Sequence, residues 1–301
     1  IMAAGGISVP LNTTNQYSDH LHVLKDSGAI GAIISGSTLA KNLLPAAVDA
    51  GLNFVITMEA IEHSGSVDIV RWEKLIADNK AATPNVDGLS RAQTACLIYT
   101  SGTGGAPKGV MLSHANLLAS TNNINKFMQI GPWAVESLPM RLSHSFGFAR
   151  LRCVLDVGGT VIFENRFFRP EKILYNMKLH EANAISSVPA GFSILLDYYR
   201  EQFEKIGPQI KYIEIGSAFM RRNHKDMLMG LCPNARICMH YGLTEASRSA
   251  FIEFHSEKDK LHTVGKSSPN VEIGIKSENG VELGPNQIGE IVVKGQMVMK
   301  G

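Results

Sequence analysis

The sequence has few cysteines, no long apolar run and no excess of charge of one sign, and each absence excludes a class of protein. Its four cysteines form no C-x-x-C pair and no His/Cys spacing typical of zinc sites, which favours reduced thiols in a cytoplasmic protein. No uninterrupted apolar run of about eighteen residues and no signal peptide is present, so neither a membrane span nor secretion is predicted. The 29 basic and 27 acidic residues form no basic tract, so nucleic acid is not an expected partner.

What is present is an ordinary globular composition in a chain whose ends look internal. The 301 residues are 45% hydrophobic, which is enough for two or three subdomains with sizeable cores. The start at Ile1-Met-Ala-Ala-Gly-Gly has the pattern of a passage from a helix to a strand, and the end at Gly301 falls inside a glycine-containing motif. We therefore expect an internal piece of a longer enzyme.

Residues 1–121 are expected to form one α/β subdomain. Ser18 is placed to cap a helix that Gly28 closes, and a second helix is expected near Leu39–Asp49. Apolar runs at Ala29–Ile34 and Phe54–Met58 alternate with these helices, which predicts βαβ units and a parallel sheet. Further elements are expected as a helix near Ile69–Asp78, a strand at Ala95–Tyr99 and a helix from Ser113 to Gln129.

Residues 122–250 repeat this alternation, which predicts a second α/β subdomain. The expected strands are Val135–Leu138, Thr160–Phe163, Ala184–Val188, Lys211–Ile215 and Arg236–His240, and the expected helices include Phe148–Asp156 and Pro170–Glu181. Residues 251–301 are expected to form a smaller β-rich subdomain. In this last part, short runs such as Ala250–Phe254, Val271–Lys276 and Glu290–Val293 alternate with turn signals, which is typical of a small antiparallel sheet or barrel.

The segment Leu97–Met111 has the composition of a phosphate-binding loop. It runs from an apolar strand into a stretch that holds hydroxyl groups, four glycines and Lys108, so backbone N–H groups and one mobile cation can approach an anion. The spacing does not fit the P-loop of NTPases, because Lys108 precedes Gly109 rather than Ser or Thr; a P-loop kinase is thereby excluded. A flexible linker is the alternative, but the flanking strand and helix disfavour it.

This segment resembles the signature loop of the adenylate-forming superfamily, which includes acyl- and aryl-CoA synthetases, luciferases and the adenylation domains of peptide synthetases. Met239-His-Tyr-Gly-Leu-Thr-Glu245 is similar to the family's Tyr-Gly-x-Thr-Glu motif. Gly289-Glu-Ile-Val-Val-Lys-Gly295, with Met299-Lys-Gly301, is similar to its later Gly-Glu motif. The three motifs occur in the family's order and spacing, and the resemblance covers essentially the whole chain. The resemblance implies two αβα subdomains with mainly parallel sheets and a β-barrel-like third, without the family's mobile C-terminal domain.

The resemblance also implies a reaction in which a carboxylate attacks the α-phosphorus of ATP, giving an acyl-adenylate and pyrophosphate. Such a step depends on positioning and charge stabilisation. The residues implied to hold the β- and γ-phosphates are Thr100, Ser101, Gly102, Thr103, Gly104 and Lys108. In the later motif, Thr244 would contact the α-phosphate, Glu245 would bind Mg²⁺, and Tyr241 and Gly242 would lie beside the adenine.

Two further segments are implied to complete the site. Gly216, Ser217 and Ala218 match the family's small-residue adenine loop, although Phe219 follows where proline is common. His144 lies in a Ser-His-Ser-Phe-Gly segment that resembles the motif beside the acyl tunnel, where it would face the substrate carboxylate. Arg150 could reach the acyl pocket; the alternatives are a solvated arginine, a phosphate-facing one, or one paired with a carboxylate elsewhere. The expected pocket-lining residues are Phe146, Phe148, Ile215, Gly242, Ser247 and Arg248.

By resemblance, the expected activity is that of an AMP-forming acid–thiol ligase with ATP, Mg²⁺ and coenzyme A. Carrier-protein phosphopantetheine is the alternative acceptor, and a degenerate nucleotide-binding module is the alternative of another class. Intact Lys108, Thr244 and Glu245 disfavour the degenerate module. The ribose-binding aspartate and the C-terminal lysine of the family would lie beyond Gly301, so we expect this piece to have little activity alone. The sequence does not identify the carboxylic acid.

Overall fold

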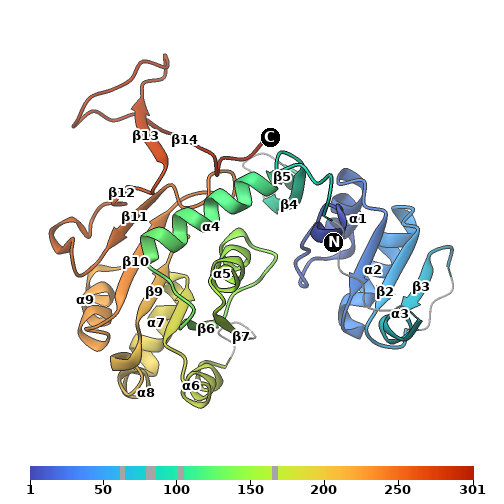
Figure 1. Cartoon of the computed structure of the whole chain (residues 1–301), viewed down its shortest axis with the longest axis horizontal. Helices are drawn as coiled ribbons and strands as arrows, with labels where there is room; N and C mark the ends of the chain where they lie inside the picture. Colours follow the sequence, from blue (N-terminus) through green and yellow to red (C-terminus); the bar gives the residue numbers. More distant parts are fainter. Residues whose placement is uncertain (62–64, 79–85, 101–104, 165–168) are drawn as a thin grey trace. The chain divides into compact units, whose positions relative to one another are not determined.

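The computed structural model describes residues 1–61, 65–78, 86–100, 105–164 and 169–301 (Figure 1). The chain divides into two compact units, residues 1–113 with 300–301 and residues 114–299. The subdomain boundaries that the sequence analysis places after residues 121 and 250 remain predictions.

The first unit is built around a three-stranded parallel sheet. The strands follow the order β1 (Gly31–Ile34), β2 (Phe54–Thr57) and β3 (Asp68–Arg71). The helices of this unit are α1 (Tyr17–Asp26), α2 (Ser37–Asp49) and α3 (Trp72–Asp78), with a short 3₁₀ turn at Met2–Ala4. Apolar side chains of α1 and α2, including Leu24 and Leu43, pack with Ile34 and Val55 of the sheet. Burial of these faces stabilises the predicted βαβ arrangement.

Two helices of this unit differ from the sequence prediction. The helix expected at Ile69–Asp78 begins only at Trp72, because the preceding residues form β3 and pair with β2. Strand pairing outweighs helix propensity here, and β-branched Ile69 and Val70 suit a strand. The first helix is capped by Gln16 rather than Ser18, since the Gln16 side chain and Asp19 form a reciprocal capping box.

The phosphate-loop segment forms a hairpin. Strands β4 (Thr94–Thr100) and β5 (Lys108–Ser113) pair antiparallel. The sequence prediction missed β5, since it placed a helix directly after the loop; helix α4 (His114–Met128) begins only after β5 ends. The missed signal is the alternation of buried Val110 and Leu112 with exposed Met111, which has the period of a strand.

The second unit contains a seven-stranded mixed sheet in the order β12-β11-β10-β9-β8-β6-β7. Strands β6 to β10 run parallel, whereas β11 and β12 pair antiparallel. The strands are β6 (Val135–Leu138), β7 (Thr160–Phe163), β8 (Ala184–Ser187), β9 (Tyr212–Ile215), β10 (Arg236–Tyr241), β11 (Ala250–Glu253) and β12 (Lys266–Ser267). The segment Ala250–Phe254, which was predicted to open the β-rich part, thus adds a strand to this sheet.

Helices cover both faces of the sheet (Figure 1). Apolar residues of α6, α7, α8 and α9 pack with Ile185, Ile213 and Ile237 on one face. Residues of α4 and α5 pack with Tyr212 and Cys238 on the other face. These helices are α5 (Ser145–Asp156), α6 (Pro170–Leu179), α7 (Pro189–Tyr198), α8 (Arg200–Glu204) and α9 (Arg222–Leu231), with 3₁₀ turns at Gly207–Gln209 and Lys258–Lys260. Alternate residues of each strand thus face different helix layers, and the predicted α/β class is confirmed.

The remaining strands, β13 (Val271–Lys276) and β14 (Glu290–Gly295), form an antiparallel hairpin. Among the residues that the structure describes, this hairpin pairs with no other strand in a sheet, so the expected barrel is not closed. No helix in the described part of the chain is long and apolar enough to cross a membrane. The buried side chains include Cys96 and Cys153, which confirms them as core residues; burial raises the pKa of the Cys153 thiol to about 11.

Candidate functional site

The base of the phosphate loop lies in the β4–β5 hairpin of the first unit. Thr100 pairs directly with Lys108 across the two strands, and Lys108 is exposed to solvent. Ser101, Gly102, Thr103 and Gly104 lie outside the described residues. The imidazole Nε2 of His22 in α1 lies 2.8 Å from the carbonyl oxygen of Pro107. The helix therefore fixes one end of the loop, a role that the sequence analysis did not assign to His22.

The other predicted site residues lie in the second unit, on segments that follow parallel strands. The small-residue turn at 216–218 follows β9, and Gly242, Thr244 and Glu245 follow β10. Strands β9 and β10 are adjacent, with Ile215 opposite Met239. Because the carboxyl ends of adjacent parallel strands share one edge of a sheet, the two turns lie side by side. This edge is where open α/β sheets bind ligands.

The turn after β9 approaches His240 so closely that only glycine fits at position 216. A Cβ atom on Gly216 would lie 2.0 Å from Cε1 and 2.2 Å from Nε2 of the His240 ring. Ser217, the next residue, has a φ of 72°, a left-handed conformation that is uncommon for a residue with a side chain. The turn is therefore strained and closely packed on one side, as expected of a segment that is held for a function.

We predict that Gly216→Ala lowers the free energy of unfolding by about 1–3 kcal/mol, because the added methyl group displaces the buried His240 ring. Gly230→Ala in α9 is the matched control, since a Cβ atom there meets nothing within 4 Å. This control is expected to be neutral or slightly stabilising. Urea denaturation of both variants measures the difference, and equal stabilities would contradict the close packing of Gly216.

The turn after β10 is held tightly by its own backbone. The N–H of Leu243 donates to the carbonyl of Ala246 at 3.1 Å, and the N–H of Ala246 donates to the carbonyl of Leu243 at 3.3 Å. A Cβ atom on Gly242 would lie 2.5 Å from the backbone nitrogen of Arg248, so this glycine allows the chain to fold back. The carbonyl of Glu245 accepts from the N–H of Met299 at 2.9 Å. Backbone contacts thus fix Glu245, and its carboxylate has no partner among the described residues.

The structure brings the His144 segment to this turn. His144 is the N-cap of α5, and its Nδ1 accepts a hydrogen bond from the N–H of Phe146 at 3.3 Å. Helix α5 therefore begins at Ser145, three residues before the predicted start, and the Ser145 hydroxyl lies 3.2 Å from that of Thr244. Burial, together with Arg248 and Arg141, lowers the pKa of His144, so a neutral imidazole is favoured at this position.

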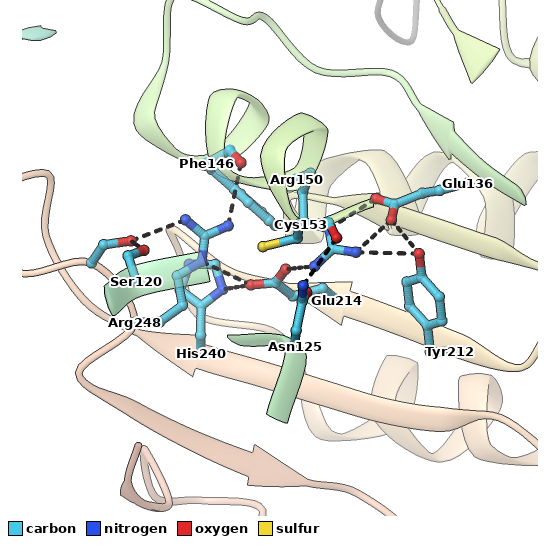
Figure 2. A network of polar contacts seen from close by, with 11 residues as sticks. Ser120, Asn125, Glu136, Phe146, Arg150, Cys153, Tyr212, Glu214, His240 and Arg248 are labelled. Carbon is cyan, nitrogen blue, oxygen red and sulfur yellow. Dashed lines mark hydrogen bonds and ion pairs between the residues drawn. The ribbon is translucent and has the colours of Figure 1, made fainter. Parts of the chain in front are cut away.

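Behind these turns, a network of charged side chains is buried between the sheet and α5 (Figure 2). Arg150 of α5 is fully buried. Its Nε donates to Glu136 of β6 at 2.9 Å, and its Nη1 donates to Glu214 of β9 at 3.0 Å. The Nε of Arg248 donates to the other oxygen of Glu214 at 2.9 Å, and Nδ1 of His240 lies 2.7 Å from that oxygen. Of the alternatives for Arg150, the pairing with carboxylates is the one observed.

The opposite charges in this network stabilise the ionised forms of Glu214 and Arg150. Burial alone would raise the pKa of Glu214, but Arg248, Arg150 and the contact with His240 outweigh it and hold the pKa far below its ordinary value. Burial disfavours the charge of Arg150, and the neighbouring carboxylates outweigh that effect and raise its pKa. For His240, burial and Arg248 prevail and lower the pKa. The network therefore favours a charged Arg150, a charged Glu214 and a neutral His240 imidazole.

Sequence reasoning missed Glu136, Glu214 and His240 as parts of the site. A signal was available, since Glu214 is the one charged residue in Tyr212–Ile215 and Glu136 interrupts Val135–Leu138. A carboxylate within a short buried strand needs a partner. The expected pocket-lining residues Phe146, Ile215 and Arg248 are buried, whereas the assignment of each candidate residue to a substrate contact stays a prediction.

Comparison with known proteins agrees with these motifs. The family model described as AMP-binding enzyme matches residues 1–301. The chain is 28% identical to a 4-coumarate–CoA ligase-like protein of Arabidopsis thaliana, over 100% of the chain and 54% of that protein. It is also 28% identical to Acyl-CoA synthetase 7 of Caenorhabditis elegans, over 87% of the chain and 50% of that protein. Among solved structures, ATP-bound MatB from Rhodopseudomonas palustris superposes with a TM-score of 0.84 at 26% identity, over 99% of this chain and 57% of that chain.

Proposed function

The chain belongs to the family of AMP-binding enzymes, and from this membership we propose that it carries most of the site in which a carboxylic acid is activated with ATP. The chain spans about half the length of the curated relatives it matches, so the activity is proposed for the full-length protein. The observation that carries the proposal is the meeting of two motif turns and the α5 N-terminus at one edge of the sheet. Relatives are named as CoA ligases, which supports coenzyme A as the acceptor.

In the proposed reaction, the second unit binds the adenosine and α-phosphate part of ATP. The turn at Gly216, Ser217 and Ala218 is proposed to face the flat base: Ser217 and Ala218 are exposed and small, while buried Gly216 lets the turn pack against His240. Tyr241 and Gly242 lie at the neighbouring strand end. Thr244 donates its hydroxyl hydrogen to the α-phosphate, and Ser145 orients that hydroxyl from 3.2 Å. Neutral His144 hydrogen-bonds the substrate carboxylate without adding a fixed charge. The contribution of these residues is positioning.

The phosphate loop is proposed to contact the β- and γ-phosphates, because it resembles the family's signature loop. Lys108 provides a cation at the base of the loop, and Thr100 flanks the loop on the paired strand. Ser101, Gly102, Thr103 and Gly104 are proposed phosphate ligands on the strength of the motif alone. A lysine and backbone N–H groups neutralise the charge that pyrophosphate carries as it leaves.

Glu245 fits the role of a magnesium ligand. Its backbone is fixed by the hydrogen bond from Met299, and its half-buried carboxylate lacks a partner among the described residues. Magnesium bound through ATP needs only one or two protein carboxylates, so a single free glutamate suffices. When bound, Mg²⁺ neutralises phosphate charge and orients the phosphate chain.

The experiment that tests the proposal is carboxylate-dependent exchange of labelled pyrophosphate into ATP by the full-length protein. Fatty, aryl and amino acids are screened in turn, because the sequence does not identify the acid. We expect exchange with one class of acid, and coenzyme A or a carrier protein is then added to that adenylate to distinguish the two acceptors. ATP binding without exchange for any acid would instead favour a degenerate nucleotide-binding module.

A further inference from the structure

One residue of the buried network is linked, through His240 and Arg248, to two segments of the proposed nucleotide site in the second unit. The Glu214 side chain is fully buried in β9, two residues before Gly216. Its Oε1 is shared by Arg248 and His240, and its Oε2 accepts from Arg150. A carboxylate in a buried strand is costly unless its lone pairs are satisfied, and here Arg150 and Arg248 donate hydrogen bonds to Glu214 while Nδ1 of His240 lies 2.7 Å from Oε1.

The first connection runs from Glu214 to the small-residue turn. His240 lies 2.7 Å from Glu214 Oε1 through Nδ1. The remainder of the His240 ring fills the space beside Gly216, where a Cβ atom would lie 2.0 Å from Cε1. The orientation of the imidazole therefore determines where the turn at 216–218 can lie, and Glu214 fixes that orientation.

The second connection runs from Glu214 to the N-terminus of α5. Arg248 is buried, and while its Nε donates to Glu214, its Nη2 donates to the carbonyl of Phe146 at 3.2 Å. Its guanidinium also lies 4.8 Å from the centre of the Phe146 ring, a favourable cation–π distance. Figure 2 shows Arg248 between Glu214 and the first turn of α5, which begins directly after His144.

We propose that Glu214 is a positioning residue for nucleotide binding: through His240 and Arg248 it holds the adenine-side turn and the start of α5 in register. This inference rests on the proposed function, and it concerns the adenosine side of the site only. Glu214 does not contact the nucleotide in this proposal. Its removal acts on the geometry of the binding segments.

Glu136 provides a matched control within the same network. Glu136 is also fully buried, and it pairs with Arg150 and with the hydroxyl of Tyr212. Among the residues that the structure describes, neither Arg150 nor Tyr212 forms a side-chain hydrogen bond to the turn at 216–218 or to the carbonyl of Phe146. Glu136→Gln and Glu214→Gln therefore remove one buried charge each, but only Glu214→Gln disturbs the binding segments.

The test measures thermal unfolding and the dissociation constants of ATP and of inorganic pyrophosphate for both variants of the full-length protein. We expect both variants to lose thermal stability. In Glu214→Gln alone, the Kd for ATP is expected to rise about tenfold, which corresponds to the loss of one well-positioned hydrogen bond. The Kd for pyrophosphate is expected to stay within about twofold, since its proposed ligands lie on the first unit.

An equal effect on ATP binding in the two variants, or none in either, would overturn the inference. If the wild-type protein binds no ATP, the proposed function fails first and this inference with it. If Glu214→Gln does not fold, the same measurements are made on the double variant Glu214→Gln/Arg248→Gln. Replacing both members of the ion pair leaves no unpaired ion. The double variant should show the same selective loss of ATP binding.

Discussion

Replacement of Arg150 by methionine is expected to lower the free energy of unfolding of the second unit by about 3–5 kcal/mol. Methionine matches the arginine stem in length but cannot pair with Glu136 and Glu214, both of which are fully buried. Two carboxylates would then remain in an apolar environment with one fewer cation. The loss therefore exceeds that of an ordinary core substitution of similar volume.

Arg222→Met is the matched control for this change. Arg222 also lies on a helix and pairs with a carboxylate, Asp226, at 3.0 Å, but both side chains are about half exposed, at 61% and 48%. Such a pair contributes no more than about 0.5 kcal/mol. Intrinsic fluorescence reports the second unit through Trp133, whose ring lies 6.0 Å from that of Tyr212; Trp72 of the first unit is replaced by phenylalanine in every variant.

A further variant distinguishes a loss of stability that unpaired charges cause from one that altered packing causes. Adding Glu136→Gln to Arg150→Met removes the carboxylate that the first change leaves without a cation, while Glu214 keeps Arg248 as its partner. We expect this double variant to recover part of the lost stability, because a neutral network costs less to bury. A stability loss for Arg150→Met that matches Arg222→Met, or a double variant that is still less stable, would contradict the electrostatic account.

Much of the fold follows from local sequence patterns. The helix near Leu39–Asp49 and the strand at Phe54–Met58 occur almost as predicted, because glycine boundaries and apolar periodicity are local signals. Strand β11 was assigned to the wrong sheet because no local signal identifies its partner strand. Three of the four residues of Ala250–Glu253 are apolar, a pattern that names no partner strand, and only pairing with β10 and β12 places the strand in the seven-stranded sheet.

The candidate site likewise has parts that the local sequence predicts and parts that only the folded chain determines. The turns at Gly216 and at Gly242 could be located from motifs because small residues mark them in the sequence. The contact between Gly216 and His240 could not be predicted from the motifs, since it depends on the register of β9 against β10. Likewise, the pairing of Arg150 with Glu136 and Glu214 joins residues that are 14 and 64 positions apart. Side-chain partners across a sheet are a property of the folded chain.

Glu245→Gln is expected to slow carboxylate-dependent pyrophosphate exchange at least about 100-fold, the upper range seen when a residue that supports a metal site is changed. The amide keeps the size of the side chain but removes the negative charge that a hard cation prefers. Raising the Mg²⁺ concentration should recover part of the rate, because the loss is one of metal affinity. Exchange is measured across a Mg²⁺ titration at saturating ATP.

Two other variants separate the metal role from a general effect of charge. Lys108→Ala is expected to slow exchange by about 10²–10³-fold, as for loss of one charge-stabilising donor, but added Mg²⁺ should not restore it because Lys108 is a cation itself. Glu272→Gln removes a glutamate from an exposed pair with Lys294 and should leave the rate unchanged. Recovery by Mg²⁺ in both Lys108→Ala and Glu245→Gln would mean that the ion screens phosphate charge without a ligand at Glu245. Recovery in Glu245→Gln alone is the result that a magnesium ligand requires.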